Sequence, residues 1–407
     1  MQFDLSKFIA EHVTRRAESL FTQDFRAAQY LLSEQIKGRS VLIIGGAGSI
    51  GSQFVKTLLP FKPSRLFVVD NDENGLTELV RDLRSTTNLF VPVTLMCYPV
   101  DYGDPVFEKI LKTEGPFDIV ANFAAHKHVR SEKDPYSIEA MIINNVFKAK
   151  RLLDLLVDHK PERFFCVSTD KAANPVNVMG ASKKLMEKLL QTYASTLPIS
   201  SARFANVAFS NGSLPAGFLQ RLQKKQPLSA PCDIKRYFLS PEESGQLCLL
   251  SCMLGQPGDI FFPKLNIEKD LMSFSEIAEA LLLSLGYSVT KCDTEQEARE
   301  NASLLDGNST NWPVYFFKSD TSGEKDVEEF FGLEETVDFT RFEKIGIIQP
   351  KLKENQFKFQ KFEKQLNHLE SLFQKDKLSK PELIEALRQI LPEFQHAEKE
   401  KNLDQRM

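Results

Sequence analysis

Short apolar runs alternate with stretches of helical spacing along the first half of the chain. Runs rich in β-branched and aromatic residues cover positions 40–44, 65–69, 91–96, 118–123 and 164–167. Between these runs, apolar side chains recur every three or four residues, which is typical of helices packed on a sheet. Unbroken β–α alternation from residue 40 to residue 171 predicts an α/β fold with a Rossmann-type, doubly wound parallel sheet.

The pattern changes after residue 200 and predicts a second, smaller domain of mixed structure. A last strand-like run covers 201–207, and helical spacing returns at 240–255 and 273–286. The polar stretch 293–311 predicts a mobile excursion. We therefore expect four parts: an N-terminal helical extension (1–37), a Rossmann domain (38–205), a smaller mixed domain (206–350) and a C-terminal helical tail (351–407), bent or broken at Ser379–Pro381.

Composition narrows the classes of protein to consider. The 407 residues are 42% hydrophobic and 26% charged, with a net charge of -4. No overall basic field is present, so nucleic acid is not expected as the main partner. No apolar run approaches 18 residues and the start has no leader pattern, so we expect a cytoplasmic chain without a membrane span. The six cysteines include no C-x-x-C pair. Cys248 and Cys252 lie one helical turn apart in an apolar run and are expected to be reduced and buried, and no metal site is expected, even at His126 and His128.

A glycine-rich turn follows the first predicted strand and precedes the first helix. Gly45 permits a tight turn, Gly48 lets backbone N–H groups approach phosphates, and Gly51 lets the helix pack on the strand. Ser49 and Ile50 lie in the same turn. Strand, glycine turn and helix in succession predict the pyrophosphate cradle of a dinucleotide.

The ends of the next strands predict further cofactor contacts. Asp70 ends the second strand, where a carboxylate accepts hydrogen bonds from ribose hydroxyls and repels a 2′-phosphate. Asn71 follows without adding a cation, so the pattern favours NAD over NADP. Asp101 could contact the adenine amino group or occupy a simple turn. Small residues at Ala124 and Ala125 would let the backbone lie close to the cofactor.

Polar residues follow the apolar run 164–167. They are Ser168, Thr169, Asp170 and Lys171, with Lys183 twelve residues further on. Ligands bind at the carboxyl edge of open α/β sheets, so we expect these side chains at the active cleft. A hydroxyl, a carboxylate and two amines can take and give protons there.

These motifs in this order resemble the extended short-chain dehydrogenase/reductase superfamily. More narrowly, they resemble bacterial nucleotide-sugar 4,6-dehydratases of the polysaccharide-biosynthesis group, whose best known members act on UDP-N-acetylglucosamine. The matching stretches lie within residues 39–335: 45–51, 124–129, 168–183, 203–207, 236–238 and 321–325. Met179 stands where the superfamily usually has Tyr, four residues before Lys183. The residues 130–132 also depart from the family's pattern.

The resemblance implies a reaction and roles for individual residues. A bound NAD would oxidise C4 of a UDP- or GDP-N-acetylhexosamine, water would leave across C5 and C6, and the hydride would return to C6. Lys171 would be the base at C5, with its pKa lowered in a cleft beside Lys183, and Asp170 the acid at the C6 oxygen. Thr169 would bind the C4 oxygen and Lys183 the nicotinamide ribose. Because Met179 cannot ionise, Asp170 could also take the C4 hydroxyl proton.

The substrate contacts and the exact activity stay open at this point. Candidates for the sugar and diphosphate are Lys127, Arg203, Asn206, Ser213 and Arg236, since arginine donors suit diphosphate oxygens. A nucleotide-sugar 4-epimerase is the nearest alternative, and a non-catalytic NAD-binding sensor is another. The superfamily commonly pairs through helices, so we expect a homo-oligomer, a dimer or larger.

Overall fold

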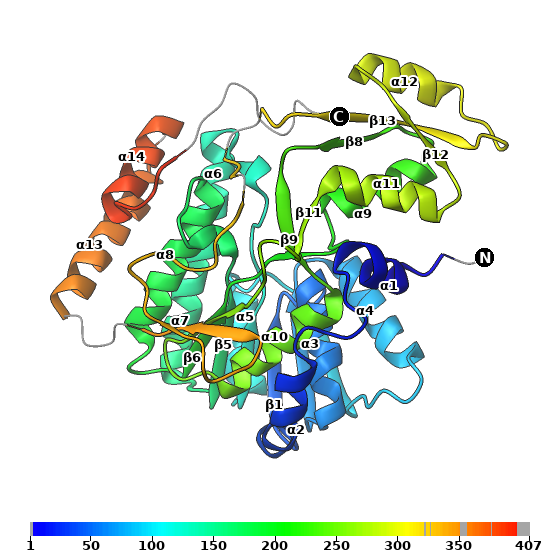
Figure 1. Ribbon diagram of the computed structural model, residues 1–407. Helices are drawn as coiled ribbons and strands as arrows, with labels where there is room; N and C mark the ends of the chain where they lie inside the picture. The colour runs from blue at the N-terminus through cyan, green and yellow to red at the C-terminus, as the bar shows by residue number, and fades with distance from the viewer. Residues whose placement is uncertain (1–2, 321–322, 326, 351–355, 376, 397–407) are drawn as a thin grey trace.

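The centre of the molecule is a nine-stranded sheet with strand order β14-β15-β10-β6-β5-β4-β1-β2-β3 (Figure 1). The structure is a computed structural model, and it describes residues 3–320, 323–325, 327–350, 356–375 and 377–396. Strands β1 to β6 and β10 pair in parallel, and β15 runs antiparallel to β10 and to β14. The predicted Rossmann-type, doubly wound fold is confirmed. The strands are β1 (Ser40–Ile44), β2 (Arg65–Asp70), β3 (Thr94–Pro99), β4 (Ile119–Asn122), β5 (Arg163–Val167), β6 (Ile199–Ala202), β10 (Ile260–Pro263), β14 (Val337–Asp338) and β15 (Ile345–Ile348).

Helices cover both faces of this sheet because its strands are apolar on both sides. Val41 and Ile43 of β1 belong to one core cluster, and Leu42 and Ile44 belong to the other. The first cluster includes residues of α2 (Thr22–Ile36), α3 (Ser49–Leu58), α4 (Glu73–Ser85) and α10 (Pro241–Leu254). The second includes residues of α5 (Pro105–Glu114), α6 (Pro135–Ile142), α7 (Lys148–Asp158) and α8 (Val178–Tyr193).

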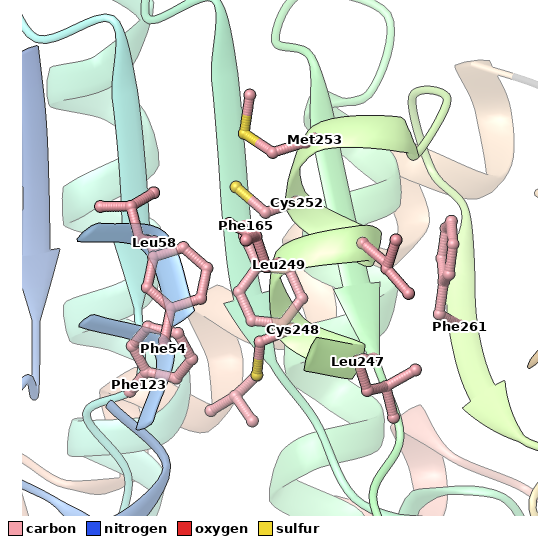
Figure 2. Packing of buried hydrophobic residues seen from close by; sticks show 14 of the residues in the cluster. Phe54, Leu58, Phe123, Phe165, Leu247, Cys248, Leu249, Cys252, Met253 and Phe261 are labelled. Carbon is pink, nitrogen blue, oxygen red and sulfur yellow. The ribbon is translucent and has the colours of Figure 1, made fainter. Parts of the chain in front are cut away.

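Two of the cysteines are ordinary core residues. Cys248 and Cys252 of α10 pack in the same cluster as Phe54 of α3 and Phe165 of β5 (Figure 2). All six cysteines are free thiols. Cys248 and Cys252 are buried as expected, whereas Cys232 is exposed.

A smaller region, in green and yellow in Figure 1, follows β6 and contains two three-stranded sheets. The expected mobile excursion at 293–311 is wrong, because residues 295–303 form a helix that is capped by Thr294 and buries Ala298. β10, β14 and β15 also lie within the predicted domain 206–350 yet join the large sheet. The elements are β7 (Asn206–Val207), β8 (Leu228–Pro231), β9 (Lys235–Leu239), β11 (Leu271–Ser273), β12 (Ser288–Lys291), β13 (Asn311–Phe317), α9 (Leu214–Gln223), α11 (Phe274–Ser284) and α12 (Glu295–Ser303).

The helices at both ends of the chain pack onto the molecule. At the N-terminal end, α1 (Leu5–Phe8) and η1 (Ile9–Val13) pack in the core of the smaller region, and Arg16 binds Glu243 of α10 at 2.8 Å. At the other end, α13 (Gln356–Leu372) and α14 (Lys380–Ile390) form a hairpin beside α6 and α8 (Figure 1). The expected break in the tail is confirmed: Ser379 is the N-cap of α14, and its side chain forms a capping box with Glu382. In the described part of the chain, we find no helix that is long and apolar enough to cross a bilayer.

Candidate active site

The loop between β1 and α3 forms a cradle of backbone groups. Gly45 has a φ of +74°, and a Cβ atom there would lie 2.5 Å from the backbone nitrogen of Ala124. A Cβ atom at Gly51 would collide with the carbonyl oxygen of Gly45. Gly48 is the N-cap of α3. Because glycine has no side chain, no N-cap side chain bonds to the first N–H groups of this helix. A helix end of this kind carries partial positive charge, so the residues present fit the pyrophosphate of a dinucleotide.

Two carboxylates lie at the carboxyl ends of the neighbouring strands: Asp70 is the last residue of β2, and Asp101 follows β3 by two residues. Asp70 accepts hydrogen bonds from the backbone nitrogens of Ala47 at 2.9 Å and Asp72 at 3.0 Å. It therefore braces the glycine loop from the neighbouring strand. Asn71 is exposed next to it. Asp101 forms an ion pair with Lys148 at 2.6 Å, so its carboxylate already has a cationic partner.

A loop after β7 crosses to the glycine turn. The Nζ of Lys127 donates to the carbonyl oxygen of Asn211 at 2.8 Å, and the nitrogen of Asn211 donates to Oγ of Ser49 at 2.8 Å. A Cβ atom at Gly212 would lie 2.9 Å from Cε1 of His128. Burial lowers the pKa of Lys127. The chain after β4, the start of α3 and residues 211–212 therefore meet in one place.

The polar residues after β5 form a compact cluster around one oxygen. Oδ1 of Asp170 accepts hydrogen bonds from Oγ1 of Thr169 at 2.9 Å, and from the backbone nitrogen and Nζ of Lys171 at 2.9 and 3.0 Å. Two residues separate the short helix η5 (Asp170–Ala172) from the end of β5, with Thr169 as the N-cap of η5, and this turn brings the side chains together. Asp170 is 2% exposed. The predicted grouping of hydroxyl, carboxylate and amine is present at the carboxyl end of β5.

The charge state of Lys171 differs from the expectation. Burial acts to lower the pKa of Lys171, but the carboxylates of Asp170 and Glu328 together outweigh it and the pKa lies above its ordinary value. The ion-pair distance from Nζ to Glu328 is 3.7 Å. The cation that acts on Lys171 is Arg236, and no effect of Lys183 on it is resolved. The expectation that the cleft beside Lys183 leaves Lys171 with a lowered pKa is therefore wrong, because the two carboxylates outweigh burial.

Helix α8 carries Met179 and Lys183 on its buried side. Lys183 is 3% exposed, and its Nζ donates to the carbonyl oxygen of Val167 at 3.0 Å. Burial lowers the pKa of this amine. Met179 is 3% exposed within the apolar cluster on that face of the sheet. Lys183 thus contacts the end of β5 directly, next to the residues that precede Asp170.

Arg203 does not lie where a substrate could reach it. Its side chain has 0% exposure and forms ion pairs at 2.7 Å with Glu187 of α8 and Glu335. Its Nη1 also donates to the carbonyl oxygen of Phe330 at 2.8 Å. We therefore correct its assignment: Arg203 fastens residues 330–335 to α8, and it is removed from the candidate diphosphate ligands.

The other candidate substrate residues lie in the smaller region. Asn206 begins β7, opposite Phe238 of β9. Ser213 is the N-cap of α9 and accepts a hydrogen bond from Ala216 at 3.3 Å, so its hydroxyl already has a structural use. Arg236 is 5% exposed and donates to the carbonyl oxygen of Lys325 at 2.8 Å.

Two buried polar residues, one beside Lys171 and the other beside His126, were not singled out from the sequence. Glu328 lies near Lys171, and its only sequence signal is its place three residues after Lys325. Asn145, in the π-helix η4 (Ile143–Phe147), donates to the carbonyl oxygen of His126 at 2.9 Å and to Ser182 of α8 at 3.0 Å. Of the resembling stretch 321–325, Thr321 and Ser322 lie outside the described residues, and Gly323 accepts a hydrogen bond from Asn177 at 2.8 Å.

Comparison with known proteins places the chain among its relatives. Residues 41–350 match the family model described as polysaccharide biosynthesis protein. The chain belongs to this polysaccharide biosynthesis protein family. The predicted resemblance to its nucleotide-sugar dehydratase members is confirmed.

Individual relatives are similar to this chain over about three fifths of its length. An uncharacterized membrane protein of Methanocaldococcus jannaschii is 35% identical over 269 residues, 63% of this chain and 75% of that protein. An inverting UDP-N-acetylglucosamine 4,6-dehydratase of Campylobacter jejuni is 27% identical over 261 residues, 62% of this chain and 73% of that one. A capsular polysaccharide biosynthesis protein, CapD, of Staphylococcus aureus is 28% identical over 57% of this chain, which spans only 39% of its length.

One solved structure shows the same fold as this chain. DesIV, a dTDP-glucose 4,6-dehydratase from Streptomyces venezuelae solved with NAD bound, superposes with a TM-score of 0.54 at 21% identity. The match covers 72% of this chain and 88% of that one. At this level of identity, the superposition shows that the two proteins share a fold.

Proposed function

We propose that this protein is an NAD-dependent nucleotide-sugar 4,6-dehydratase that acts on a UDP- or GDP-activated N-acetylhexosamine. The observation that carries the proposal is the cluster of Thr169, Asp170 and Lys171, joined on Oδ1 of Asp170 at 2.9 to 3.0 Å. An acid and a base at adjacent positions are what elimination of water between neighbouring carbons requires. The related Campylobacter jejuni protein, described as a UDP-N-acetylglucosamine 4,6-dehydratase, supports the substrate class.

The glycine loop supports a nicotinamide dinucleotide as the cofactor. The backbone around Gly45 and Gly48 would hold the pyrophosphate at the start of α3, Gly51 lets the helix pack closely on this turn, and Asp70 would face the ribose hydroxyls. A carboxylate at this position disfavours the 2′-phosphate of NADP, which supports NAD. When bound at this loop, the nicotinamide would supply reversible hydride transfer for the sugar at C4 and C6.

The residues of the cluster divide the proton transfers among them. Thr169 donates a hydrogen bond to the C4 oxygen, and Asp170 takes the C4 hydroxyl proton because Met179 offers no ionisable group. Lys171 removes the C5 proton once C4 is a ketone. Asp170 then gives its proton to the departing C6 hydroxyl, which leaves as water. Lys171 returns a proton to C5 at the end, so the protein finishes as it began.

Cations around the cluster would hold the anionic part of the substrate. Lys127 donates a hydrogen bond to the loop at Asn211. Arg236 lies close enough to Lys171 for its positive charge to act on the pKa of that amine. Arginine presents several donors in a fixed plane and suits two phosphate oxygens at once. Asn206 and Ser213 remain candidates for hydrogen bonds to the sugar.

The test is a reaction with a panel of UDP- and GDP-activated N-acetylhexosamines in deuterated water. We expect one substrate to lose the mass of one water and to show a C6 methyl signal with deuterium at C5. Asp170→Asn and Lys171→Ala should each lower kcat by roughly 10²- to 10⁴-fold. Lys109→Ala, which removes an exposed amine from α5, should leave kcat unchanged.

Other outcomes of the same reaction would contradict the proposal. A product with only an inverted C4 would make the protein a 4-epimerase. Protein that binds NAD but leaves every nucleotide sugar unchanged would be a sensor. Full turnover of the Asp170→Asn variant would remove the cluster from the chemistry, even with the expected product.

A further inference from the structure

Glu328 is a buried carboxylate that faces the proposed base. The residue is 4% exposed, and its Oε1 lies 3.7 Å from Nζ of Lys171. Its Oε2 is buried and has no hydrogen-bond partner among the described residues. A buried oxygen without a partner is costly, because it has lost its contacts with water. The fold therefore keeps an acid next to Lys171 at a cost in stability.

The charged groups around Glu328 come from three parts of the chain. Lys171 and Asp170 lie on η5, Arg236 on β9, and Lys325 precedes it on the same segment. Burial raises the pKa of Glu328, and the ammonium of Lys171 offsets only part of this rise. The carboxylate of Asp170 acts in the same direction as burial, whereas Arg236 and Lys325 oppose it. Glu328 therefore accepts a proton more readily than a carboxylate in water does.

Lys171 needs such a neighbour. An amine removes a proton from carbon only in its neutral form, yet two carboxylates hold Lys171 as an ammonium. Asp170 cannot relieve it, because Asp170 takes the C4 hydroxyl proton in the proposed cycle. The remaining carboxylate within ion-pair distance of Nζ, among the described residues, is Glu328.

We propose that Glu328 is a positioning residue that takes the ammonium proton of Lys171 and so makes this amine available as the base. This inference rests on the proposed function. The proton moves from Nζ of Lys171 to Glu328, which leaves a neutral amine beside a neutral carboxylic acid. The separation of 3.7 Å exceeds a hydrogen bond, and contacts of this kind commonly shorten when substrate binds.

The proton balance closes over one turnover. Asp170 receives the C4 hydroxyl proton and passes it to the C6 oxygen. Lys171 receives the C5 proton and returns it to C5, while Glu328 keeps the proton it took from the ammonium. After product leaves, that proton can return to Lys171, so no external acid or base is consumed.

The competing explanation is that Glu328 is only a fixed negative charge. In that case Glu328→Gln removes one of the two carboxylates that raise the pKa of Lys171. Lys171 would then become neutral more easily, and turnover near neutral pH would stay the same or rise. The proposed role requires the opposite result, because glutamine cannot accept the proton.

The experiment compares Glu328→Gln, Glu328→Asp and the control Glu329→Gln by the pH dependence of kcat. Glu329 is the adjacent carboxylate, and its side chain is 57% exposed. We expect Glu328→Gln to lose roughly 10²-fold in kcat at neutral pH, with KM within a few-fold of the parent. Its kcat should rise about tenfold per pH unit above neutral, because hydroxide then removes the ammonium proton instead. Glu328→Asp should retain part of the activity, and Glu329→Gln should match the parent.

Two results would overturn the inference. One is a Glu328→Gln variant with the parent's kcat and pH profile, and the other is a loss of equal size at every pH, which would indicate a structural role. A second measurement does not depend on turnover: the pH dependence of Lys171 modification by acetic anhydride, followed by mass spectrometry. The apparent pKa of Lys171 should fall in Glu328→Gln, which would show that the two side chains face each other in solution, and the pH dependence of kcat then distinguishes a proton acceptor from a fixed charge. An unchanged apparent pKa would overturn the inference. If the pKa falls while the parent dehydrates no sugar, the contact exists but the proposed function fails, and the proton-accepting role of Glu328 fails with it.

Discussion

At the scale of single residues, the position of Arg203 shows how a buried ion pair orders a loop around the site. Its guanidinium is enclosed between Glu187 of α8 and Glu335, and Lys184 also binds Glu335 at 2.7 Å. Glu187 in turn accepts a hydrogen bond from Ser168 at 2.6 Å, directly before Thr169. Removing one partner of such a pair would leave an unpaired charge in the interior, which is strongly destabilising. The network therefore holds α8, the end of β5 and residues 330–335 together.

This network predicts a dependence of stability on pH. Against the effect of burial, Arg203 and Lys184 lower the pKa of Glu335 from 4.5 to about 2. A lowered pKa in the folded state means that the contribution is fully present above the unfolded value near 4.5 and is lost as the pH falls toward 2. The shift corresponds to about 3 kcal/mol. We expect Glu335→Gln to be less stable than the parent at neutral pH, with the difference vanishing toward pH 2 in urea unfolding.

The control for this prediction is Glu334→Gln, which changes the adjacent exposed carboxylate. Its unfolding free energy should follow the parent at each pH. A Glu335→Gln variant that loses stability in parallel with the parent on acidification would show that this carboxylate is not the group that titrates.

At the scale of elements, the turn between β1 and α3 separates two uses of glycine. Gly51 has no room for a side chain, since a methyl group would meet the backbone of Gly45 and Gly46. Gly48 has room, because the nearest atom to its added Cβ is the Gly45 oxygen at 3.5 Å, an ordinary contact. Gly51 is thus needed by the fold, whereas Gly48 is needed by a ligand that approaches the start of the helix.

We therefore predict that glycine-to-alanine substitution affects stability at Gly51 and NAD binding at Gly48. Gly51→Ala should destabilise the protein by about 1–3 kcal/mol, because backbone atoms must shift to admit the methyl group. Gly48→Ala should unfold like the parent but bind NAD at least tenfold more weakly, since the methyl group would lie in the path of the pyrophosphate. Thermal unfolding without cofactor and calorimetric titration with NAD measure the two effects. Unchanged NAD binding by Gly48→Ala would contradict the placement of the pyrophosphate.

The same scale shows what the sequence could and could not predict. Apolar runs and the glycine turn located β1, β2, β4 and β5 and the cluster at Asp170, because periodicity and turn chemistry are local properties. The helix at 295–303 was missed because its outer face is almost entirely polar and only Ala298 and Ala302 are buried. Arg203 was assigned to substrate because its partners, Glu187 and Glu335, become neighbours only through folding. For the same reason, nothing local identifies Glu328 as a neighbour of Lys171.

At the scale of the whole molecule, the C-terminal hairpin belongs to the same apolar cluster as the sheet. Leu369 of α13 and Leu387 of α14 share this cluster with Leu42 of β1 and Leu185 of α8. Beyond the hairpin, the nitrogen of Gln395 donates to the carbonyl oxygen of Pro175 at 3.1 Å. The tail therefore extends the core from the helices to the segment that follows the candidate catalytic residues.

This continuity predicts that the hairpin and the Rossmann sheet unfold together. Leu387 has 0% exposure, so Leu387→Ala should cost about 2–5 kcal/mol and lower the midpoint of a single transition. Leu283→Ala, which truncates a leucine of α11 that is 64% exposed, is the matched control and should change little. Circular dichroism and the fluorescence of Trp312, in the smaller region, should report the same shifted midpoint. Two separate transitions, with only the minor one moved, would mean that the hairpin folds as an independent unit and leaves the sheet's helices unsupported when it opens.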